Sequence, residues 1–432
     1  MIAAFRSQIL VCTSLAFICL ESVLQSTVRR DRTHRFYPRE FPIRYVPLDG
    51  ELRGETVRVA GDARQRFHDS RGYGRSLGGN EIALSRVEAA HLLFRGDLGS
   101  ITAAGDKLDF PAFFGRSAAV GGRFAARFLV YTDLRDRGFY LSPAKEGWSG
   151  TAPEDHTSHD IDFTVYERGA DPGGAVAYRV CVLGERESIA ASGLAGLTLA
   201  IVDEESDISY FSATRPELTG ETPFEPPADL SGLLLEDRVV VWDTPPALYE
   251  HGFYGRPISS RGDSFGGAVQ LSLVEAASLI GAGQLSLSGT VNGAETDALG
   301  ENGASDIDTE PPTGDAGHAV TDPRAAVVAR GRAVEGERFD RRLRVYERLR
   351  GADLVPKTGY KFGADFRTYR DIDHVDNLPH SEHLIRVVES DHVFDPRDLA
   401  LDVRLAGGVR KRMLFGLAGE SVSFVEVGRL TP

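Results

Sequence analysis

Apolar and polar positions follow two periods along this chain. Four stretches alternate between the two classes, or are continuously apolar, over seven to nine residues, and we expect them to form β-strands: 177–184, 208–214, 383–390 and 422–430. The runs VYTDL (130–134) and VYERL (345–349) instead have the spacing of a helix face. The pattern predicts a mixed α/β protein.

A helix-start signal occurs twice, in the motif LS-x-VEAA. Ser85 is followed three residues later by Glu88, and Ser272 by Glu275. A serine before the first helical turn with a glutamate three residues on is the signature of a capping box. We therefore expect a helix to begin after each serine and interpret both glutamates as caps rather than as catalytic groups.

The repeated motifs indicate an internal duplication. The capping serines are 187 residues apart (Ser85 to Ser272), whereas the tyrosines of VYTDL and VYERL are 215 apart (Tyr131 to Tyr346). The second copy must therefore contain an insertion. The stretch 289–323, rich in Gly, Asp, Glu, Thr and Pro, fits it and is typical of a solvated, poorly ordered loop.

Each copy is expected to have an α+β N-terminal domain and an α/β C-terminal domain. The predicted organisation is an extension outside the fold (1–47), a first copy (48–115 and 116–214), a Pro-rich linker (215–232), and a second copy (233–335, including the acidic insertion, and 336–432).

Residues 1–47 differ in character from the rest. An apolar run (9–24) follows Arg6, but it contains polar residues and is shorter than the roughly 20 residues that span a bilayer. A basic stretch comes next. We interpret the segment as upstream sequence read as protein, with the protein beginning near 48–51, and a targeting or anchoring segment as the alternative.

The charge balance argues against an ordinary nucleic-acid binder. The net charge is −14, and only five of the 49 basic residues are lysines. Phosphate contacts usually require a basic face. However, an acidic, lysine-poor, arginine-retaining composition resembles proteins of salt-loving archaea, and in molar salt the Debye length is only about 3 Å. Under such conditions a global negative charge would repel RNA little.

The small number of cysteines limits the cellular compartments and the metal sites that the sequence supports. Two of the three cysteines lie in the extension, which leaves Cys181 alone in the body of the chain. One cysteine supports neither a disulfide framework nor a thiolate metal cage. The natural compartment is a reducing cytoplasm, and we expect no metal or other cofactor.

Three polar residues near the C-terminus are candidates for catalysis. Tyr369 ends an alternating run, His380 follows a turn-rich loop, and Lys411 lies in VRLAGGVRKRM, which we expect to be helical. Histidine titrates near neutrality and suits a general acid, and lysine can stabilise an anionic transition state. Tyrosine is a poor base unless its environment favours the phenolate. Alone, each residue could be structural.

The motifs FRTY, HSEHLIRVV and VRLAGGVRKRM resemble the catalytic half of archaeal tRNA-splicing endonucleases, and the chain is most similar to the haloarchaeal, two-repeat, homodimeric type. The resemblance implies excision of introns from precursor tRNA at a bulge-helix-bulge, with a nuclease-like C-terminal domain. Tyr369 would deprotonate the 2′-hydroxyl, His380 would protonate the 5′-oxygen, and Lys411 would stabilise the phosphorane-like state. The products would be 2′,3′-cyclic phosphate and 5′-hydroxyl ends, with no metal required.

The resemblance also implies RNA and protein contacts. Arg404, which would share a helix face with Lys411, is expected to stack on a bulged base, with Arg429 as its partner. The acidic turn is expected to dock on the partner chain of a homodimer through Asp203, Glu204, Glu205 and Asp207. A charged hairpin tip is the plain alternative.

The first copy differs where the chemistry would be. Tyr166 aligns with Tyr369, but the following loop has no histidine, and an ungapped alignment places Leu197 opposite Lys411. We therefore expect one catalytic and one degenerate copy. Two alternatives to an endonuclease stay open: a non-catalytic RNA-binding or structural subunit, and a membrane-anchored or secreted protein that would depend on residues 9–24 alone.

Overall fold

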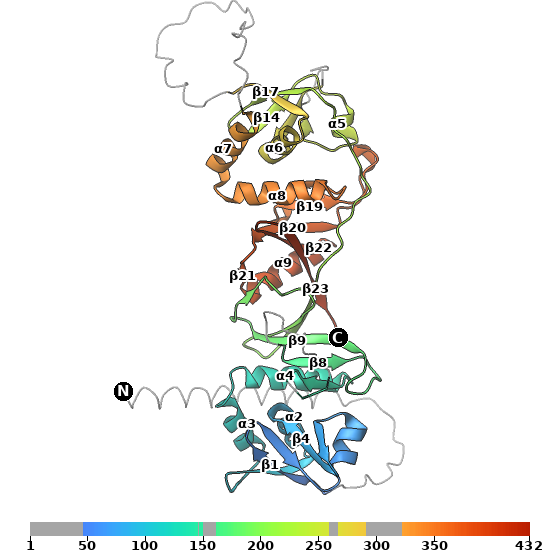
Figure 1. The fold of residues 1–432 in the computed structure, drawn as a ribbon, viewed down its shortest axis with the longest axis vertical. Coiled ribbons are helices and arrows are strands. Elements are labelled where there is room, and N and C mark those ends of the chain that lie inside the picture. The colour runs from blue at the N-terminus through green and yellow to red at the C-terminus, as the bar shows by residue number, and fades with distance from the viewer. Residues whose placement is uncertain (1–45, 146, 150–160, 259–266, 291–321) are drawn as a thin grey trace, which may run out of the picture. The chain divides into compact units, whose positions relative to one another are not determined.

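The computed structural model describes residues 46–145, 147–149, 161–258, 267–290 and 322–432 (Figure 1). The predicted extension, apart from its last two residues, and the predicted insertion, apart from its ends, lie outside these ranges. The chain forms two compact units. The first contains the chain up to Thr214 with Val393–Leu401 and Gly428–Pro432, and the second contains Arg215–His392 with Asp402–Val427.

The first unit begins with a six-stranded sheet covered by helices. Its strand order is β3-β4-β2-β1-β5-β6, antiparallel except for the β1–β5 pair. The elements are β1 (Leu48–Arg53), β2 (Thr56–Val59), β3 (Arg75–Gly78), β4 (Glu81–Ser85), α2 (Arg86–Phe94), β5 (Leu98–Ala103), β6 (Asp106–Leu108) and α3 (Phe110–Ala118), with a short π-helix at Arg64–Asp69.

A second sheet follows α4 (Phe124–Asp136) in this unit. Its order is β12-β11-β9-β8-β7, and only β9 and β11 are parallel. The strands are β7 (Leu141–Pro143), β8 (Phe163–Tyr166), β9 (Val176–Gly184), β11 (Thr198–Val202) and β12 (Ile208–Thr214), and the short β10 (Ile189–Ala190) pairs with β21 (Val393–Phe394).

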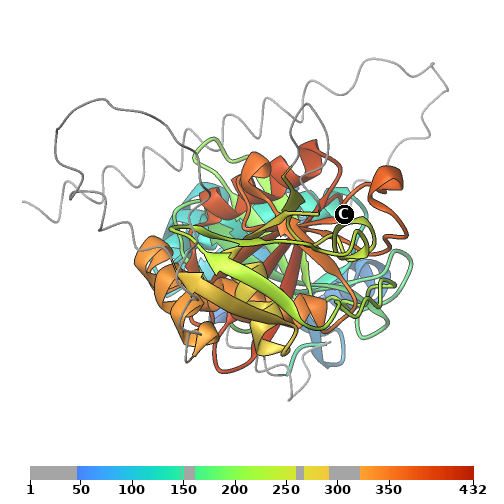
Figure 2. The ribbon, with the colours of Figure 1, turned by 90° about the horizontal axis from the view of Figure 1, so that it is seen from above.

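The second unit repeats this plan. Its first sheet, β15-β16-β14-β13-β17, has one parallel pair, β13–β17, which corresponds to β1–β5. Helices α6, α7 and α8 pack against one another (Figures 1 and 2). The elements are β13 (Leu230–Leu234), β14 (Arg238–Val241), α5 (Ala247–Glu250), β15 (Arg256–Pro257), β16 (Val269–Ser272), α6 (Leu273–Gly281), β17 (Leu285–Thr290), α7 (Pro323–Glu335) and α8 (Arg338–Arg350).

The C-terminal sheet has the order β18-β19-β20-β22-β23, with β20 and β22 parallel and the other pairs antiparallel. The mixed α/β fold class is therefore confirmed, and the strands expected at 208–214 and 422–430 have those bounds. The elements are β18 (Val355–Thr358), β19 (Phe366–Tyr369), β20 (His383–Glu389), α9 (Pro396–Gly408), β22 (Arg412–Ala418) and β23 (Val422–Leu430).

Both predicted capping boxes are present. The backbone N–H of Glu88 donates to the Ser85 hydroxyl while the glutamate accepts from the serine backbone, and Ser272 and Glu275 repeat the arrangement. Each glutamate also accepts a backbone N–H from a glycine, at 2.7 Å in the first copy and 3.0 Å in the second. At Gly255, with φ +58°, a Cβ atom would lie 2.4 Å from the Gln270 carbonyl oxygen, so only glycine allows this approach.

The helix expected through VRLAGGVRKRM is shorter than predicted, because α9 ends at Gly408. The Lys411 N–H donates to the Ala406 carbonyl and the Arg410 N–H to that of Gly407, which is the Schellman pattern, and Arg410 has φ +57°. Leu405 and Val409, two apolar residues of this motif, are 51% and 41% exposed. Two consecutive glycines and the left-handed residue end the helix at Gly408, three residues before Lys411.

Candidate active site

The register of the C-terminal sheet brings the three candidate motifs to one edge. His383, at the start of β20, pairs with Thr368 near the end of β19 and with Arg412 at the start of β22. Because β19 is antiparallel to β20 and β22 is parallel to it, the end of the first strand meets the beginnings of the other two. Tyr369, His380 and Lys411 each lie within three residues of this row.

Tyr369 is the last residue of β19 and is 5% exposed. Its ring packs against Phe253, with the centroids 5.7 Å apart, in a small apolar cluster that includes Val355 and Ile372. No hydrogen bond from the hydroxyl to another side chain occurs among the described residues. The ring is therefore fixed by packing, while the hydroxyl is left without a protein partner there.

His380 is exposed just before β20, whereas His383 is buried. The Nδ1 atom of His383 lies 3.0 Å from the Thr368 hydroxyl, and burial, with a smaller effect of Arg412, lowers its pKa to about 4. The two histidines therefore lie in different surroundings, and only His380 is accessible to a substrate. A third histidine, His374, lies in the preceding loop with its Nδ1 accepting the Asp376 N–H at 3.1 Å.

Lys411 is held beside the histidine segment. Its ammonium donates to the carbonyl of Ser381, the residue after His380, at 2.8 Å, and lies 5.6 Å from the centroid of the Phe362 ring. Burial lowers the pKa of Lys411, and the nearby Arg367 guanidinium lowers it further. Burial makes the charged form of Lys411 less stable, so an anion bound beside its ammonium would stabilise that form.

The remaining predicted contact residues are exposed, except Asp203, which is half-buried. Arg404 is exposed on α9, and Arg429 is exposed near the end of β23. Since Lys411 lies beyond the end of α9, the argument that Arg404 and Lys411 share a helix face is wrong. In the acidic turn Glu204, Glu205 and Asp207 are exposed, and the half-buried Asp203 accepts the backbone N–H groups of Glu205 and Asp207 at 2.9 Å each. Glu204 also forms an ion pair with Arg186 at 2.7 Å.

Strand pairing also corrects the alignment of the two copies. Phe163 pairs with Val180 and Phe366 with Ile385, and these partners are level with Thr198 in β11 and Leu414 in β22. The first copy therefore has Met413 matched by Leu197 and Lys411 matched by Ala195. The ungapped alignment failed because the β11–β12 turn (203–207) is two residues longer than the β22–β23 turn (419–421). Neither Leu197 nor Ala195 could supply the amine of Lys411.

Two cations near Tyr369 were not identified from the sequence. Lys357 on β18 donates to Glu275 at 2.7 Å and to the carbonyls of Phe253 and Gly255 at 3.1 Å each. Arg367, two residues before Tyr369, has its guanidinium carbon 5.6 Å from the Tyr369 ring centroid. The rarity of lysine could have drawn attention to Lys357, but no local pattern assigns it a partner.

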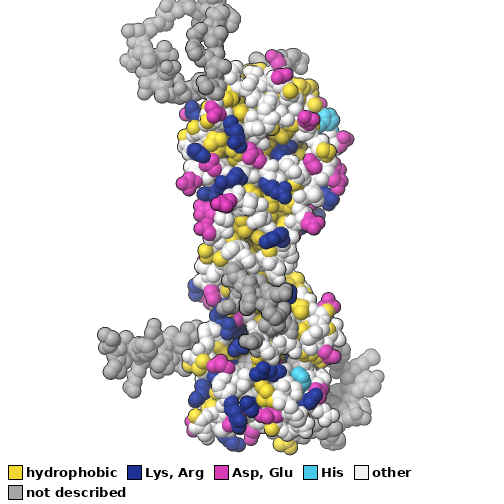
Figure 3. All heavy atoms as spheres, viewed as in Figure 1, with side chains coloured by type: hydrophobic (Ala, Val, Ile, Leu, Met, Phe, Trp, Pro, Cys, Tyr) yellow, Lys and Arg dark blue, Asp and Glu magenta, His cyan; other side chains and the backbone are white. Residues whose placement is uncertain are grey.

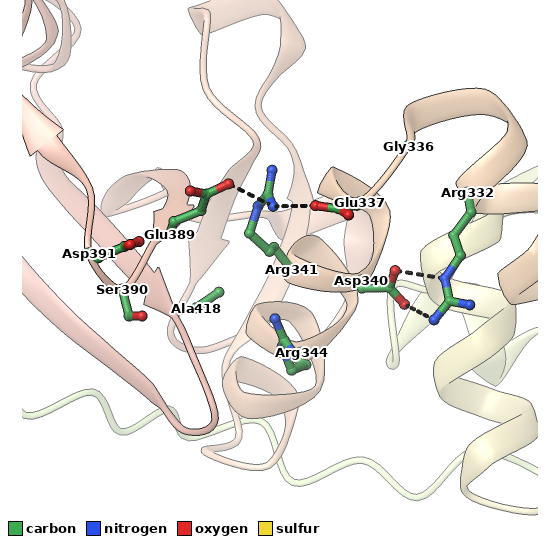
Figure 4. A pocket seen from close by; sticks show the side chains of 10 residues that line it. All are labelled: Arg332, Gly336, Glu337, Asp340, Arg341, Arg344, Glu389, Ser390, Asp391 and Ala418. Carbon is green, nitrogen blue, oxygen red and sulfur yellow. Dashed lines mark hydrogen bonds and ion pairs between the residues drawn. The ribbon is translucent and has the colours of Figure 1, made fainter.

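A cavity of about 880 Å³ lies elsewhere in the second unit (Figure 4). Its charges are largely neutralised within it, because Arg332 binds Asp340 and Arg341 binds Glu389, each through contacts of 2.8–3.0 Å. Figure 3 shows cationic and anionic side chains similarly interspersed over the face drawn. A cavity lined by paired ions offers less to a phosphate than a cation without a partner, so it is a weaker candidate.

Two further observations concern only the parts of the chain that the structure describes. They contain no group of three His, Cys, Asp or Glu side chains arranged to hold a metal ion. None of their helices combines the length and apolar character needed to cross a bilayer.

Comparison with known proteins identifies the family. The model of the tRNA intron endonuclease N-terminal domain matches twice, at 48–114 and 230–297, and that of the catalytic C-terminal domain matches 339–423. The tRNA-splicing endonucleases of Halobacterium salinarum and Haloarcula marismortui are each 49% identical to the chain, over 389 residues (89% of this chain, 100% of the relative) and 385 residues (88% and 99%). That of Methanococcoides burtonii is 34% identical over 400 residues (89% and 99%). The chain belongs to the tRNA intron endonuclease family.

Proposed function

We propose that this protein excises introns from precursor tRNA by cutting at bulge-helix-bulge motifs. Family membership supports the general activity, tRNA splicing by an endonuclease. The observation that carries the chemistry is the strand register, because it aligns the end of β19 with the beginnings of β20 and β22, next to which Tyr369, His380 and Lys411 lie.

The proposed reaction is transesterification within the RNA followed by release of the leaving strand. Tyr369 accepts the proton of the 2′-hydroxyl, whose oxygen attacks the adjacent phosphorus. His380 donates a proton to the departing 5′-oxygen, and Lys411 stabilises the added negative charge. The products are a 2′,3′-cyclic phosphate and a 5′-hydroxyl. The exposure of His380 supports its role, since a leaving oxygen must reach it.

Recognition of the bulge is proposed to use arginines. Arg404 and Arg429 are both exposed, and neither has an ion-pair partner among the described residues. A planar guanidinium can stack on an unpaired base, which is how single-stranded RNA is commonly recognised.

The assembly is proposed to be a homodimer in which the first copy has a structural role. The first copy has Ala195 where the second has Lys411, and its Tyr166 is fully buried, with its hydroxyl 3.2 Å from that of Ser142. The acidic turn with Asp203, Glu204, Glu205 and Asp207 is proposed to dock on a partner chain. Action in the cytoplasm is also part of the proposal, and it is supported by a single body cysteine, Cys181, which is free and buried.

The decisive experiment is cleavage of a model bulge-helix-bulge RNA by the full chain, in high potassium chloride with EDTA. We expect the His380→Ala variant to cut about 10²–10⁴-fold more slowly than wild type, which is the usual effect of losing a positioned acid. His374→Ala, which removes a neighbouring histidine of the loop, should stay within about threefold of wild type, the spread expected of a group that takes no part in proton transfer.

Each outcome has a distinct meaning. Cyclic phosphate ends formed in EDTA would support the proposed reaction without a metal. If His380→Ala cut as fast as His374→Ala, the role of His380 would be refuted. A folded wild-type protein that bound the RNA without cutting it would instead favour a non-catalytic RNA-binding subunit.

A further inference from the structure

Arg367, the second residue of the FRTY motif, is a half-buried arginine beside the candidate active site. It lies on β19 two residues before Tyr369, so both side chains are on the same face of the strand. Its Nε atom is shielded from solvent and has no hydrogen-bond partner among the described residues. No carboxylate in the described parts of the chain forms an ion pair with its guanidinium.

Three other cations of the C-terminal sheet form ion pairs, whereas Arg429, which has none among the described residues, is exposed to water. These pairs are Lys357 with Glu275, Arg412 with Glu426, and Arg386 with Asp402. With 63 acidic and 49 basic residues, the chain has carboxylates in excess, so a half-buried arginine without one is notable. A buried donor that lacks an acceptor destabilises the fold, unless a ligand supplies the acceptor.

A second cation lies close by. Arg367 is near enough to Lys411 for its charge to lower the pKa of the lysine, after the larger effect of burial. Lys411 itself donates only to a neutral carbonyl, that of Ser381. Two positive groups are thus close to each other without an anion between them among the described residues, an arrangement that favours binding of a negatively charged ligand.

Arg367 also lines a cavity of suitable size. The cavity has a volume of about 530 Å³, and its lining includes Tyr249, Phe253 and Arg256. It also includes two ion pairs, Lys357 with Glu275 and Arg238 with Asp237, so Arg367 and Arg256 are the lining cations without a carboxylate partner among the described residues. Phe253 contacts both this space and the Tyr369 ring, so the cavity adjoins the candidate active site. Aromatic rings beside cations are the usual lining of a site for a single-stranded nucleic-acid segment.

The first copy has no cation at the positions that match Arg367 and Lys357. In the second copy Arg367 pairs across the strands with Lys357, and in the first copy the corresponding pair is Thr164 with Ser142. The feature therefore belongs to the copy that retains Tyr369, His380 and Lys411, as expected of a group that acts on the substrate rather than one that the fold requires.

We propose that Arg367 binds a backbone phosphate of the RNA next to the cleavage site, beside Lys411. The inference rests on the proposed function and adds a substrate contact to it. A guanidinium can donate two parallel hydrogen bonds to a phosphate, which a lysine cannot do.

The test uses Arg367→Gln in the full chain, with Arg344→Gln as the matched control. Arg344 is exposed on α8 and lines the other cavity (Figure 4), so this control removes the same charge elsewhere. Affinity for the model RNA and single-turnover cleavage are measured across a series of potassium chloride concentrations. We expect Arg367→Gln to weaken binding about 10- to 100-fold, as for loss of a charged hydrogen bond.

The salt dependence separates a phosphate contact from a structural role. Losing one phosphate contact should reduce the slope of log affinity against log salt by about 0.7–0.9, and Arg344→Gln should leave it unchanged. Arg367→Lys, which keeps the charge, should retain most of the slope. A folded Arg367→Gln protein with the slope and affinity of wild type would overturn the proposal.

A second measurement does not depend on the variant folding. Single phosphates flanking the cut are replaced by uncharged methylphosphonates, each after a 2′-O-methyl nucleotide, and binding to the wild-type protein is measured. At least one replacement should weaken binding about tenfold or more, as for loss of one charged contact. If none does, the proposal is wrong. If wild type fails to cleave the unmodified RNA, the proposed function fails first, and the two failures are thereby distinguished.

Discussion

Two glutamates with the same local contacts have pKa values shifted in opposite directions in the two copies. Glu88 and Glu275 both complete a capping box and both accept a backbone N–H from a glycine. Burial raises the pKa of Glu88. Burial would also raise the pKa of Glu275, but the Lys357 ammonium, together with the backbone N–H groups of Ser272 and Gly255, outweighs this effect and brings the pKa to about 2. One residue on a separate strand accounts for much of the difference.

The difference extends toward the candidate active site. Lys357 binds the carbonyl of Phe253, whose ring packs on Tyr369, so the ion pair with Glu275 fixes the surroundings of the proposed base. In the first copy the residue that matches Lys357 is Ser142, whose hydroxyl is the partner of Tyr166. In the first copy the Tyr166 hydroxyl thus has a hydrogen-bond partner within the protein. In the second copy packing fixes the Tyr369 ring, and its hydroxyl has no protein partner among the described residues.

The largest effect is expected from breaking the ion pair of the second copy. Glu275→Gln leaves the Lys357 ammonium buried without its carboxylate and should lower the free energy of unfolding by about 3–5 kcal/mol. Glu88→Gln removes no ion pair and should cost only about 1–2 kcal/mol, from altered hydrogen bonds. Denaturant unfolding of both variants measures the contrast. Equal losses would show that the pair contributes no more than the caps do.

The pH dependence of these variants should differ in sign. Glu275 has a folded pKa below its ordinary value of 4.5, so its stabilisation is present above pH 4.5 and lost as pH falls toward 2. Glu88 has a raised pKa, so its stabilisation is present below pH 4.5 and lost as pH rises through the folded value. From pH 7 to 3, the cost of Glu275→Gln should shrink and that of Glu88→Gln should grow. Parallel profiles would contradict the assigned difference.

A smaller effect should follow from the helix end that only the second copy has. In the first copy β9 and β11 are joined without a helix, so the Schellman end of α9 has no counterpart there. Arg410 has φ +57°, a conformation that favours glycine. Arg410→Gly should therefore raise the free energy of unfolding by about 0.5–1 kcal/mol. A lower melting temperature would mean that the arginine side chain makes a compensating interaction.

Local signals in the sequence predicted a large part of this fold. Ser85 and Ser272 mark helix starts because capping is decided within four residues, and the strand at 422–430 is visible from alternation alone. The three candidate residues were found by motif, and the sheet register then explains why motifs far apart in the chain lie at one edge. Their catalytic roles stay a prediction.

What the sequence did not show depends on contacts between distant residues. The partnership of Lys357 with Glu275 spans 82 positions, and no periodicity encodes it. The position of Lys411 was misjudged because a short apolar pattern continued past Gly408, where the backbone and not the pattern ends the helix. Likewise, the match of Leu197 to Lys411 failed because two extra residues in a turn change the register without changing the appearance of the strands.

The hydrogen bonds of Lys357 limit how far lysine can be replaced by arginine in this chain. Its ammonium has three N–H bonds in a tetrahedral arrangement and meets three acceptors: two backbone carbonyls and one carboxylate. A guanidinium directs its donors within a plane and could not satisfy all three from the same point. A chain that uses arginine for 44 of its 49 cations therefore has at least one position where the exchange would be a change of geometry. Lysines on the surface can be exchanged for arginine as a protein adapts to salt, whereas the buried Lys357 cannot.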